Sequence, residues 1–397
     1  MAQENRRGAD AQQNSYAVAG SADESSSDCV SAGCSRPEHV GFGARWFRLW
    51  CSHPDSIVDD IDCGGYARPA AVPGILRNVP QRALITGVGG QDGSYLAEYL
   101  IGRGVEVLGA EREGASGTYP NLVAMRDSIE MITVDLCDAA SVVGAVEQRR
   151  PTMIFHLAAS SFVPTSWLHP TPAVEMAATS TSAFLDAIVN IDRSIRFFQA
   201  ASAEVFGRPT ESPQSETTPI APITPYGAGK ALSLFLVRMY RERFDLHAST
   251  GILFNHESPR RPVDFVTRKI TQAAVEISRG NQTELRLGNL DAERDWTFAG
   301  DTVRGMALML EGDKPDDYVL ASGTTHAIRE VLDIGFGRVG LDWHDFVVVD
   351  EQFNRPNEAI SICGDPSKAE RELGWHRDVS FQELIELMVD ADLETTT

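Results

Sequence analysis

The stretch that decides the fold is RALITGVGGQDGSYLAEYLIGRG at residues 82–104, followed by VEVLGAE at residues 105–111. An apolar run leads into a glycine-rich turn and an amphipathic segment, and a second apolar run follows. This order predicts a strand, a helix and a second strand parallel to the first, because the helix serves as the crossover between them. We therefore expect a parallel sheet at the centre of the fold.

The same alternation continues downstream. Apolar runs at 131–136, 152–159 and 196–202 alternate with helical patterns at 139–150 and 179–191. This predicts an α/β protein of the Rossmann type, with a doubly wound parallel sheet and right-handed crossovers. We expect a dinucleotide-binding core at residues 81–253. Residues 254–393 should form mainly a smaller, mixed α/β substrate-binding lobe of loops and short helices, with some elements returning to the core.

The first 80 residues have a different composition from the remainder. They are rich in Ser, Ala, Asp, Glu and Gly and lack sustained apolar periodicity, which predicts a disordered extension. A tryptophan-rich patch at residues 39–51 could dock on the main domain or on a partner, or could simply collapse on itself. The candidate metal ligands in this part are Cys29, Cys34, Cys51, Cys63, His39 and His53. Their spacing is not that of a zinc knuckle, so we expect no metal site.

Charge and composition exclude several classes of partner. The chain has 397 residues, a formal net charge of −21 and 43% hydrophobic residues. A field of this sign repels phosphates, so we expect neither nucleic acid nor an anionic membrane surface as a partner. The sequence contains no apolar run of about 20 residues and its start does not resemble a signal peptide, so we expect a cytoplasmic protein.

Gly87, Gly90 and Gly93 form a G-x-x-G-x-x-G pattern directly after a strand and before a helix. Glycines let the backbone approach a pyrophosphate, and a helix amino terminus favours its negative charge. A tight turn alone would also need glycine, but the strand-turn-helix setting favours a dinucleotide. The predicted contacts are Gly87, Gly90, Gln91, Asp92, Gly93, Arg112, Asp135, Leu136, Leu157, Ala158, Ala159 and Ser160, with Tyr226 and Lys230 at the nicotinamide end.

The choice of dinucleotide rests on Glu111, Arg112 and Glu113 at the end of the second strand. A carboxylate there would accept hydrogen bonds from the ribose of NAD, whereas Arg112 would pair with the additional phosphate of NADP. A solvated charged loop is the alternative. We expect NADP, with NAD as the other possibility.

A candidate catalytic set begins at the end of the strand predicted at 196–202 and continues into the helix that follows it. Tyr226 and Lys230 are four residues apart in PYGAGK, so on a helix they share a face, and the ammonium favours the phenolate that acts as a base. Ser202 and Glu204 follow the strand FFQAA at the carboxyl edge of the sheet. Ser202 can hold a sugar hydroxyl, and Glu204 adds an acid/base that a simple reductase would not need. The alternative is a loop serine with an exposed carboxylate.

At this point the sequence resembles the GDP-mannose 4,6-dehydratase family. The resemblance extends in collinear order over about residues 81–393, and its most distinctive segment is GILFNHESPRR followed by FVTRKIT. The other matching segments are TGVGGQDGSYLAEYL, LGNLDAERDW and RPNEAISICGDPSKAERELGW. Long matched strings are more specific than the glycine pattern alone.

The resemblance implies conversion of GDP-mannose to GDP-4-keto-6-deoxymannose through a nicotinamide cofactor, by a homo-oligomer. It implies that Ser202, Glu204, Tyr226 and Lys230 are catalytic and that His256 and Arg261 contact the cofactor. The implied sugar-nucleotide contacts are Asn255, Lys269, Arg294, Arg355 and Glu358. Basic residues can neutralise a diphosphate locally, which the acidic chain as a whole cannot. For each of them, a surface salt bridge is the alternative role.

The chain departs from the family pattern at several positions. Ser202 replaces the usual threonine, Ala203 the usual serine, and Pro172 the usual tyrosine. The run Glu111 to Glu113 stands where the family tends to have paired arginines, and a shorter stretch follows it. Alternative functions are a related epimerase, reductase or dehydratase of another nucleotide sugar, or a catalytically silent dinucleotide-binding scaffold.

Overall fold

The computed structural model describes residues 81–115, 117–159, 161–353 and 362–394. The predicted extension at residues 1–80, including its tryptophan-rich patch and four cysteines, lies outside the described residues. No helix within the described ranges is both long and apolar enough to cross a membrane.

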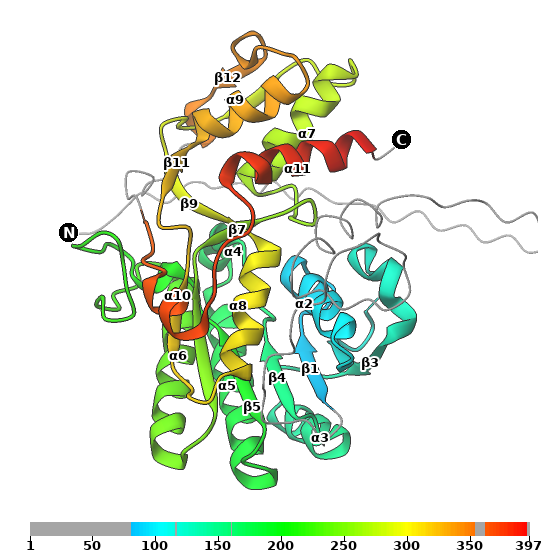
Figure 1. The fold of residues 1–397 in the computed structure, drawn as a ribbon, viewed down its shortest axis with the longest axis vertical. Helices are drawn as coiled ribbons and strands as arrows, with labels where there is room; N and C mark the ends of the chain where they lie inside the picture. The colour runs from blue at the N-terminus through cyan, green and yellow to red at the C-terminus, as the bar shows by residue number, and fades with distance from the viewer. Residues whose placement is uncertain (1–80, 116, 160, 354–361, 395–397) are drawn as a thin grey trace, which may run out of the picture. The chain divides into compact units, whose positions relative to one another are not determined.

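A seven-stranded sheet forms the centre of the described chain (Figure 1), and all its neighbouring strands are parallel. The chain order reverses between β1 and β4, which lie side by side, and this is the doubly wound Rossmann arrangement that the sequence predicts. The strands in sheet order are β10 (Asp317–Leu320), β6 (Ala248–Leu253), β5 (Arg196–Ala200), β4 (Met153–His156), β1 (Arg82–Thr86), β2 (Glu106–Glu111) and β3 (Ile129–Thr133).

Helices cover both faces of this sheet. Leu84 and Ile85 are neighbours on β1, yet both are fully buried and they belong to different hydrophobic clusters. Successive strand residues point to opposite faces, so each face must have its own cover. One cluster includes α2 (Gln91–Gly102) and α8 (Ala299–Glu311). The other includes α3 (Ala139–Arg149), α5 (Pro170–Ile191) and α6 (Pro225–Phe244).

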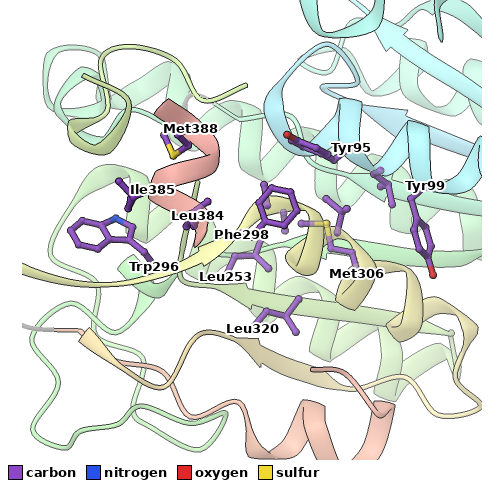
Figure 2. Packing of buried hydrophobic residues seen from close by; sticks show 14 of the residues in the cluster. Tyr95, Tyr99, Leu253, Trp296, Phe298, Met306, Leu320, Leu384, Ile385 and Met388 are labelled. Atoms are coloured by element: carbon purple, nitrogen blue, oxygen red, sulfur yellow. The ribbon is translucent and has the colours of Figure 1, made fainter. Parts of the chain in front are cut away.

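A second group of elements continues the first cluster beyond the sheet. Figure 2 shows Tyr95 of α2 and Phe298 in the same apolar cluster as Trp296 and Met388. The helices of this group are α7 (Val266–Ser278), α9 (Ile328–Arg338) and α11 (Phe381–Glu394), which pack on one another. The strands are β7 (Asn255–Glu257), β9 (Glu293–Phe298) and β11 (Thr325–Ala327) in one sheet, and β8 (Leu285–Leu287) and β12 (Val347–Val349) in another.

Several predicted boundaries differ from the structure. The strand expected at 131–136 is β3, Ile129–Thr133, and the helix expected from 179 begins at Pro170, because proline is accepted in a first helical turn. The segments around residues 255 and 293 were expected to be loops and short helices, but they contain β7 and β9, which pair with each other. β7 has only three residues, too few to show an alternating pattern, and β9 begins with the polar residues Glu293, Arg294 and Asp295.

Candidate active site

A cavity of about 1630 Å³ opens beyond the carboxyl ends of the central strands. Its lining includes Gly87 after β1, Leu157 after β4, Ala201 after β5 and Phe254 after β6. This is where a doubly wound sheet binds its ligands. Seventeen predicted site residues line it: Gly87, Gly90, Gln91, Asp92, Gly93, Leu157, Ala158, Ala159, Ser202, Glu204, Tyr226, Lys230, Asn255, His256, Arg261, Lys269 and Arg294.

The glycine turn brings bare backbone to this cavity. Gly87 has a φ of +72°, and a Cβ atom there would lie 3.1 Å from Cα of Ala158. A Cβ atom on Gly93 would lie 2.3 Å from the carbonyl oxygen of Gly87, so no side chain fits between helix α2 and the turn. Gly90 is the N-cap of α2 and has no side chain to cap it. The backbone of this turn is therefore accessible to a pyrophosphate.

A buried hydrogen-bonded chain holds the neighbouring turn after β4. The hydroxyl of Thr86 accepts hydrogen bonds from the backbone N–H groups of Leu157 and Ala158, each at 3.0 Å. It can therefore donate its proton to Nδ1 of His156 at 2.8 Å, while Nε2 of that ring lies 2.8 Å from Oγ of Ser180. Burial, with the charge of Lys230, lowers the pKa of His156 to about 3. A neutral imidazole thus supports one wall of the cavity.

The first turn of α2 is bonded to β7. Nε2 of His256 lies 2.9 Å from Oδ2 of Asp92, and Nδ1 lies 2.6 Å from the carbonyl oxygen of Phe254. Both partners accept hydrogen bonds, so this geometry favours the imidazolium, which can donate from both ring nitrogens. Burial opposes this charge, but Asp92 outweighs it and raises the pKa of His256. Against the effect of burial, His256 lowers the pKa of Asp92 to about 2.

Gln91 strengthens the same connection. Its Nε2 donates to the carbonyl oxygen of His256 at 3.0 Å, and its Oε1 accepts from Oγ of Ser258 at 2.8 Å. Gln91 and Ser258 are buried. The glycine turn that lines the cavity and strand β7, which follows Phe254, are therefore fixed to each other.

Tyr226 and Lys230 lie in the first two turns of α6. Nζ of Lys230 donates to the carbonyl oxygen of Ala200 at 2.7 Å and lies 5.8 Å from the centroid of the Tyr226 ring. Burial lowers the pKa of Lys230 to about 8, although the charge of Asp92 opposes the change. Burial raises the pKa of Tyr226 to about 12, although a hydrogen bond with Ser202 opposes it. A further positive charge is needed before the phenolate forms near neutral pH.

Glu204 is held beside this helix by a loop that packs on the start of α6. Its backbone N–H donates to Oγ of Ser202 at 3.3 Å, and Oγ1 of Thr224 lies 3.4 Å from its Oε2. Thr224 also caps α6 by accepting from the N–H of Gly227 at 2.9 Å. A Cβ atom on Gly227 would lie 2.6 Å from the Glu204 carbonyl oxygen, so glycine permits this approach.

Basic side chains line the part of the cavity that faces the second group of elements. Nε of Arg261 is buried without a hydrogen-bond partner, although it lies 3.3 Å from a carboxylate oxygen of Glu257. Its guanidinium stacks 3.5 Å from the ring centroid of Phe265. Lys269 on α7 donates to the carbonyl oxygen of Arg286 at 2.8 Å. These residues and Arg294 can provide positive charge for a diphosphate.

Some predicted residues do not line the cavity. Arg112 and Asp135 are exposed, and Leu136 packs against the cluster on the α3 side of the sheet. Glu111, at the end of β2, accepts a hydrogen bond at 3.0 Å from the hydroxyl of Tyr119, whose ring faces Gly89. The remaining predicted residues, Ser160, Arg355 and Glu358, lie outside the described residues. Within the described ranges, no group of three or more His, Cys, Asp or Glu side chains could hold a metal ion.

Sequence reasoning missed other residues of the site. Thr224 was detectable, because a threonine directly before Pro225 is a typical start of a helix. Trp167 lines the cavity and is 61% exposed, but an isolated tryptophan in the sequence carries no such signal. The role of His156 depends on Thr86 and Ser180, which are distant in the chain.

Comparison with known proteins shows which family the chain is similar to. A sequence model described as GDP-mannose 4,6 dehydratase matches residues 84–388. GDP-mannose 4,6 dehydratase 2 of Arabidopsis thaliana is 44% identical over 324 residues, which cover 79% of this chain and 87% of that protein. The human GDP-mannose 4,6 dehydratase is 39% identical over 345 residues, covering 80% and 92%. A solved Thermus thermophilus UDP-glucose 4-epimerase in complex with NAD has a TM-score of 0.70 and 26% identity, covering 80% of this chain and 100% of that one.

Proposed function

Because the chain belongs to the GDP-mannose 4,6-dehydratase family of nucleotide-sugar dehydratases, we propose that it converts GDP-mannose to GDP-4-keto-6-deoxymannose. The enzyme is a hydro-lyase that works with a nicotinamide cofactor. The observation that carries the proposal is the meeting of Ser202, Glu204, Tyr226 and Lys230 in one cavity with the glycine turn. A simple reductase has no use for the additional carboxylate.

The residues present fit a dinucleotide. The bare turn from Gly87 to Gly93 would hold the pyrophosphate, and the turn supported by Thr86 would hold the nicotinamide ribose. When bound, the nicotinamide supplies a hydride acceptor for carbon 4 and a hydride donor for carbon 6 of the sugar.

Tyr226 is the proposed base in the first half of the reaction. It takes the proton from the hydroxyl group on carbon 4, which becomes a ketone as that carbon loses a hydride. Lys230 stabilises the phenolate by its charge, and Ser202 orients the hydroxyl group. A bound oxidised nicotinamide would add its positive charge to that of Lys230, and both charges favour the Tyr226 phenolate that acts as the base.

Glu204 is the proposed base in the second half. The new ketone acidifies the proton on carbon 5, and Glu204 removes that proton. The hydroxyl group on carbon 6 leaves as water, and protonated Glu204 can supply the proton that it needs. The double bond between carbons 5 and 6 would then receive a hydride at carbon 6 and a proton at carbon 5. Tyr226 can return the proton that it took in the first half, so no cofactor is consumed overall.

Incubation of the full chain with a panel of nucleotide sugars tests the proposal. We expect GDP-mannose to give a product lighter by one water without net change of the cofactor. An epimerase would leave the mass unchanged, and a reductase would consume cofactor. Either result with GDP-mannose, or dehydration of a UDP- or CDP-sugar instead, would contradict the proposal.

We propose NADP as the preferred form of the cofactor, by a small margin. Tyr119 already occupies one carboxylate oxygen of Glu111, and exposed Arg112 beside it can pair with the additional phosphate. Titration of both dinucleotides should give tighter binding of NADP, and Arg112→Ala should remove the preference. If the protein binds NAD more tightly than NADP, and Glu111→Ala reverses that preference, the assignment of NADP is wrong.

We further propose a cytoplasmic homo-oligomer, a dimer or a tetramer, whose partner is its nucleotide-sugar substrate and not a nucleic acid or a membrane. Phe235 and Met239 support self-association, because they are exposed one turn apart on α6. Light scattering of the full chain measures its mass in solution, and a monomer at all concentrations would contradict this part of the proposal.

A further inference from the structure

One face of α7 lines the cavity. Lys269, Gln272 and Glu276 recur at intervals of three and four residues, and all three line the cavity. With a rise of 1.5 Å per residue, Lys269 and Glu276 are separated by about 10 Å along the helix axis. That is on the order of the distance from the phosphates of a nucleoside diphosphate to the far edge of its base.

Glu276 has a fixed carboxylate. Nη1 of Arg279 lies 3.3 Å from its Oε1, and Nδ2 of Asn281 donates to its Oε2 at 2.9 Å. The side chain is 28% exposed. A carboxylate accepts about four hydrogen bonds in total, so these two contacts orient Glu276 and leave acceptor positions available.

The walls beside Glu276 are apolar. Ala273 on α7 and Leu285 and Leu287 on β8 line the same cavity, and all three are at least 95% buried. Gln272 precedes Glu276 by one helical turn, so an amide and a carboxylate are neighbours at the edge of this apolar surface. The arrangement fits a flat ring with a polar edge.

We infer that Gln272 and Glu276 recognise the guanine base of the substrate, an inference that rests on the proposed function. Guanine presents an oxygen acceptor at position 6 and N–H donors at positions 1 and 2 on one edge. The amide N–H₂ of Gln272 donates to the oxygen, and the carboxylate of Glu276 accepts from both donors. Lys269 then lies where the diphosphate would be.

The other bases do not match this pair. Uracil and thymine present an oxygen atom where guanine has its amino group, so an acceptor would face the carboxylate. Cytosine and adenine present an N–H₂ group to Gln272, whose amide oxygen can accept from it, but they present a ring nitrogen acceptor to Glu276. When an acceptor of the base faces the carboxylate, neither group forms a hydrogen bond. This loss favours guanine over the other bases.

Binding of diphosphates without the sugar separates base recognition from catalysis. The probes are GDP, IDP, whose base lacks only the amino group at position 2, and UDP, each titrated calorimetrically into the full chain. A charge-assisted hydrogen bond predicts that GDP binds about 10- to 100-fold more tightly than IDP. UDP should bind more weakly than either.

Three variants complete the test. Glu276→Ala should bring the affinities for GDP and IDP within about twofold of each other. Gln272→Ala should weaken both by a similar factor, since both bases carry the oxygen at position 6. Glu284→Gln changes an exposed carboxylate in the following loop, outside the cavity, and should change neither affinity. If Glu276→Ala does not fold, Glu276→Gln preserves its size and should retain only part of the preference.

A GDP preference over IDP that survives in folded Glu276→Ala, or no preference in the parent protein, would overturn the inference. Failure of the proposed function would look different, because the parent protein would then bind UDP more tightly than GDP or leave GDP-mannose unchanged.

Discussion

At the scale of single residues, Glu204 and Tyr226 meet at the start of α6 but act in different halves of the proposed reaction. Glu204→Gln keeps the shape of the side chain and removes the base. We expect the oxidation at carbon 4 to survive and the elimination to slow by roughly 10² to 10⁴. Reduced cofactor and a bound 4-keto sugar should accumulate, which near-ultraviolet absorbance of the nicotinamide would detect after mixing with GDP-mannose.

Tyr226→Phe is the matched comparison. It leaves the ring and removes the only group proposed to accept the first proton, so no reduced cofactor should form at all. If Glu204→Gln instead releases dehydrated product at close to the parent rate, Glu204 is not the base and the proposed dehydratase mechanism is wrong.

His156 makes folding stability depend on pH. Its pKa is about 3 in the folded protein and about 6.5 in an unfolded chain, so the unfolded state binds a proton first as the pH falls. The contribution of neutral His156 to the free energy of unfolding is complete above pH 6.5 and is lost as the pH falls towards 3. Between pH 7 and pH 5 we expect a loss of roughly 2 kcal/mol of unfolding free energy.

Urea unfolding of the parent protein and of His156→Gln isolates this contribution from other titrating groups. The variant should be less stable at pH 7, because it lacks the fitted ring between Thr86 and Ser180. The difference between the two proteins should narrow as the pH falls. A difference that stays constant down to pH 5 would show that His156 does not titrate as described.

At the scale of elements, two glycines in helices predict opposite outcomes. Gly93→Ala places a methyl group against the rigid backbone of Gly87 and Val88, and we expect a loss of about 1–3 kcal/mol of stability. Gly144→Ala in α3 has its nearest neighbour at 3.8 Å, the end of a flexible glutamine, and should gain up to about 1 kcal/mol. Thermal melting of both variants checks this, and equal shifts would contradict it.

The same elements show how far the sequence alone reaches. The strand, turn and helix at 82–104 depend on local apolar spacing and glycines, and β1 and α2 confirm them. The helix predicted at 139–150 is confirmed as α3, Ala139–Arg149. The strands β7 and β9 were not predicted, because they are recognised by their pairing with each other and not by a pattern in their own sequences.

Site residues follow the same division. Tyr226 and Lys230 share a helix, so their spacing alone places them on one face. The bond between Asp92 and His256 joins positions 164 residues apart, and no local pattern reveals it. The role inferred for Gln272 and Glu276 could be recognised only from the cavity that both residues line, since the same spacing also occurs on any solvated helix.

At the scale of the whole molecule, the proposed activity should not need residues 1 to about 75. Their composition predicts no buried core, and the first strand of the sheet begins at Arg82. A truncation that starts near Ile75 should keep dehydratase activity and cooperative melting. Loss of soluble protein would show that the tryptophan-rich patch at 39–51 is integral to the domain.

The position of β10 also determines when the protein can fold during synthesis. β6 ends at Leu253, but its outer neighbour is β10, Asp317–Leu320, and α11 at the end of the chain completes the cluster that contains α2. On the ribosome, the dinucleotide half therefore emerges with an open strand edge and an uncovered apolar face. Such edges pair readily with other chains. A chain synthesised only as far as β6 should therefore associate with other chains more readily than one that also contains β10 and α11.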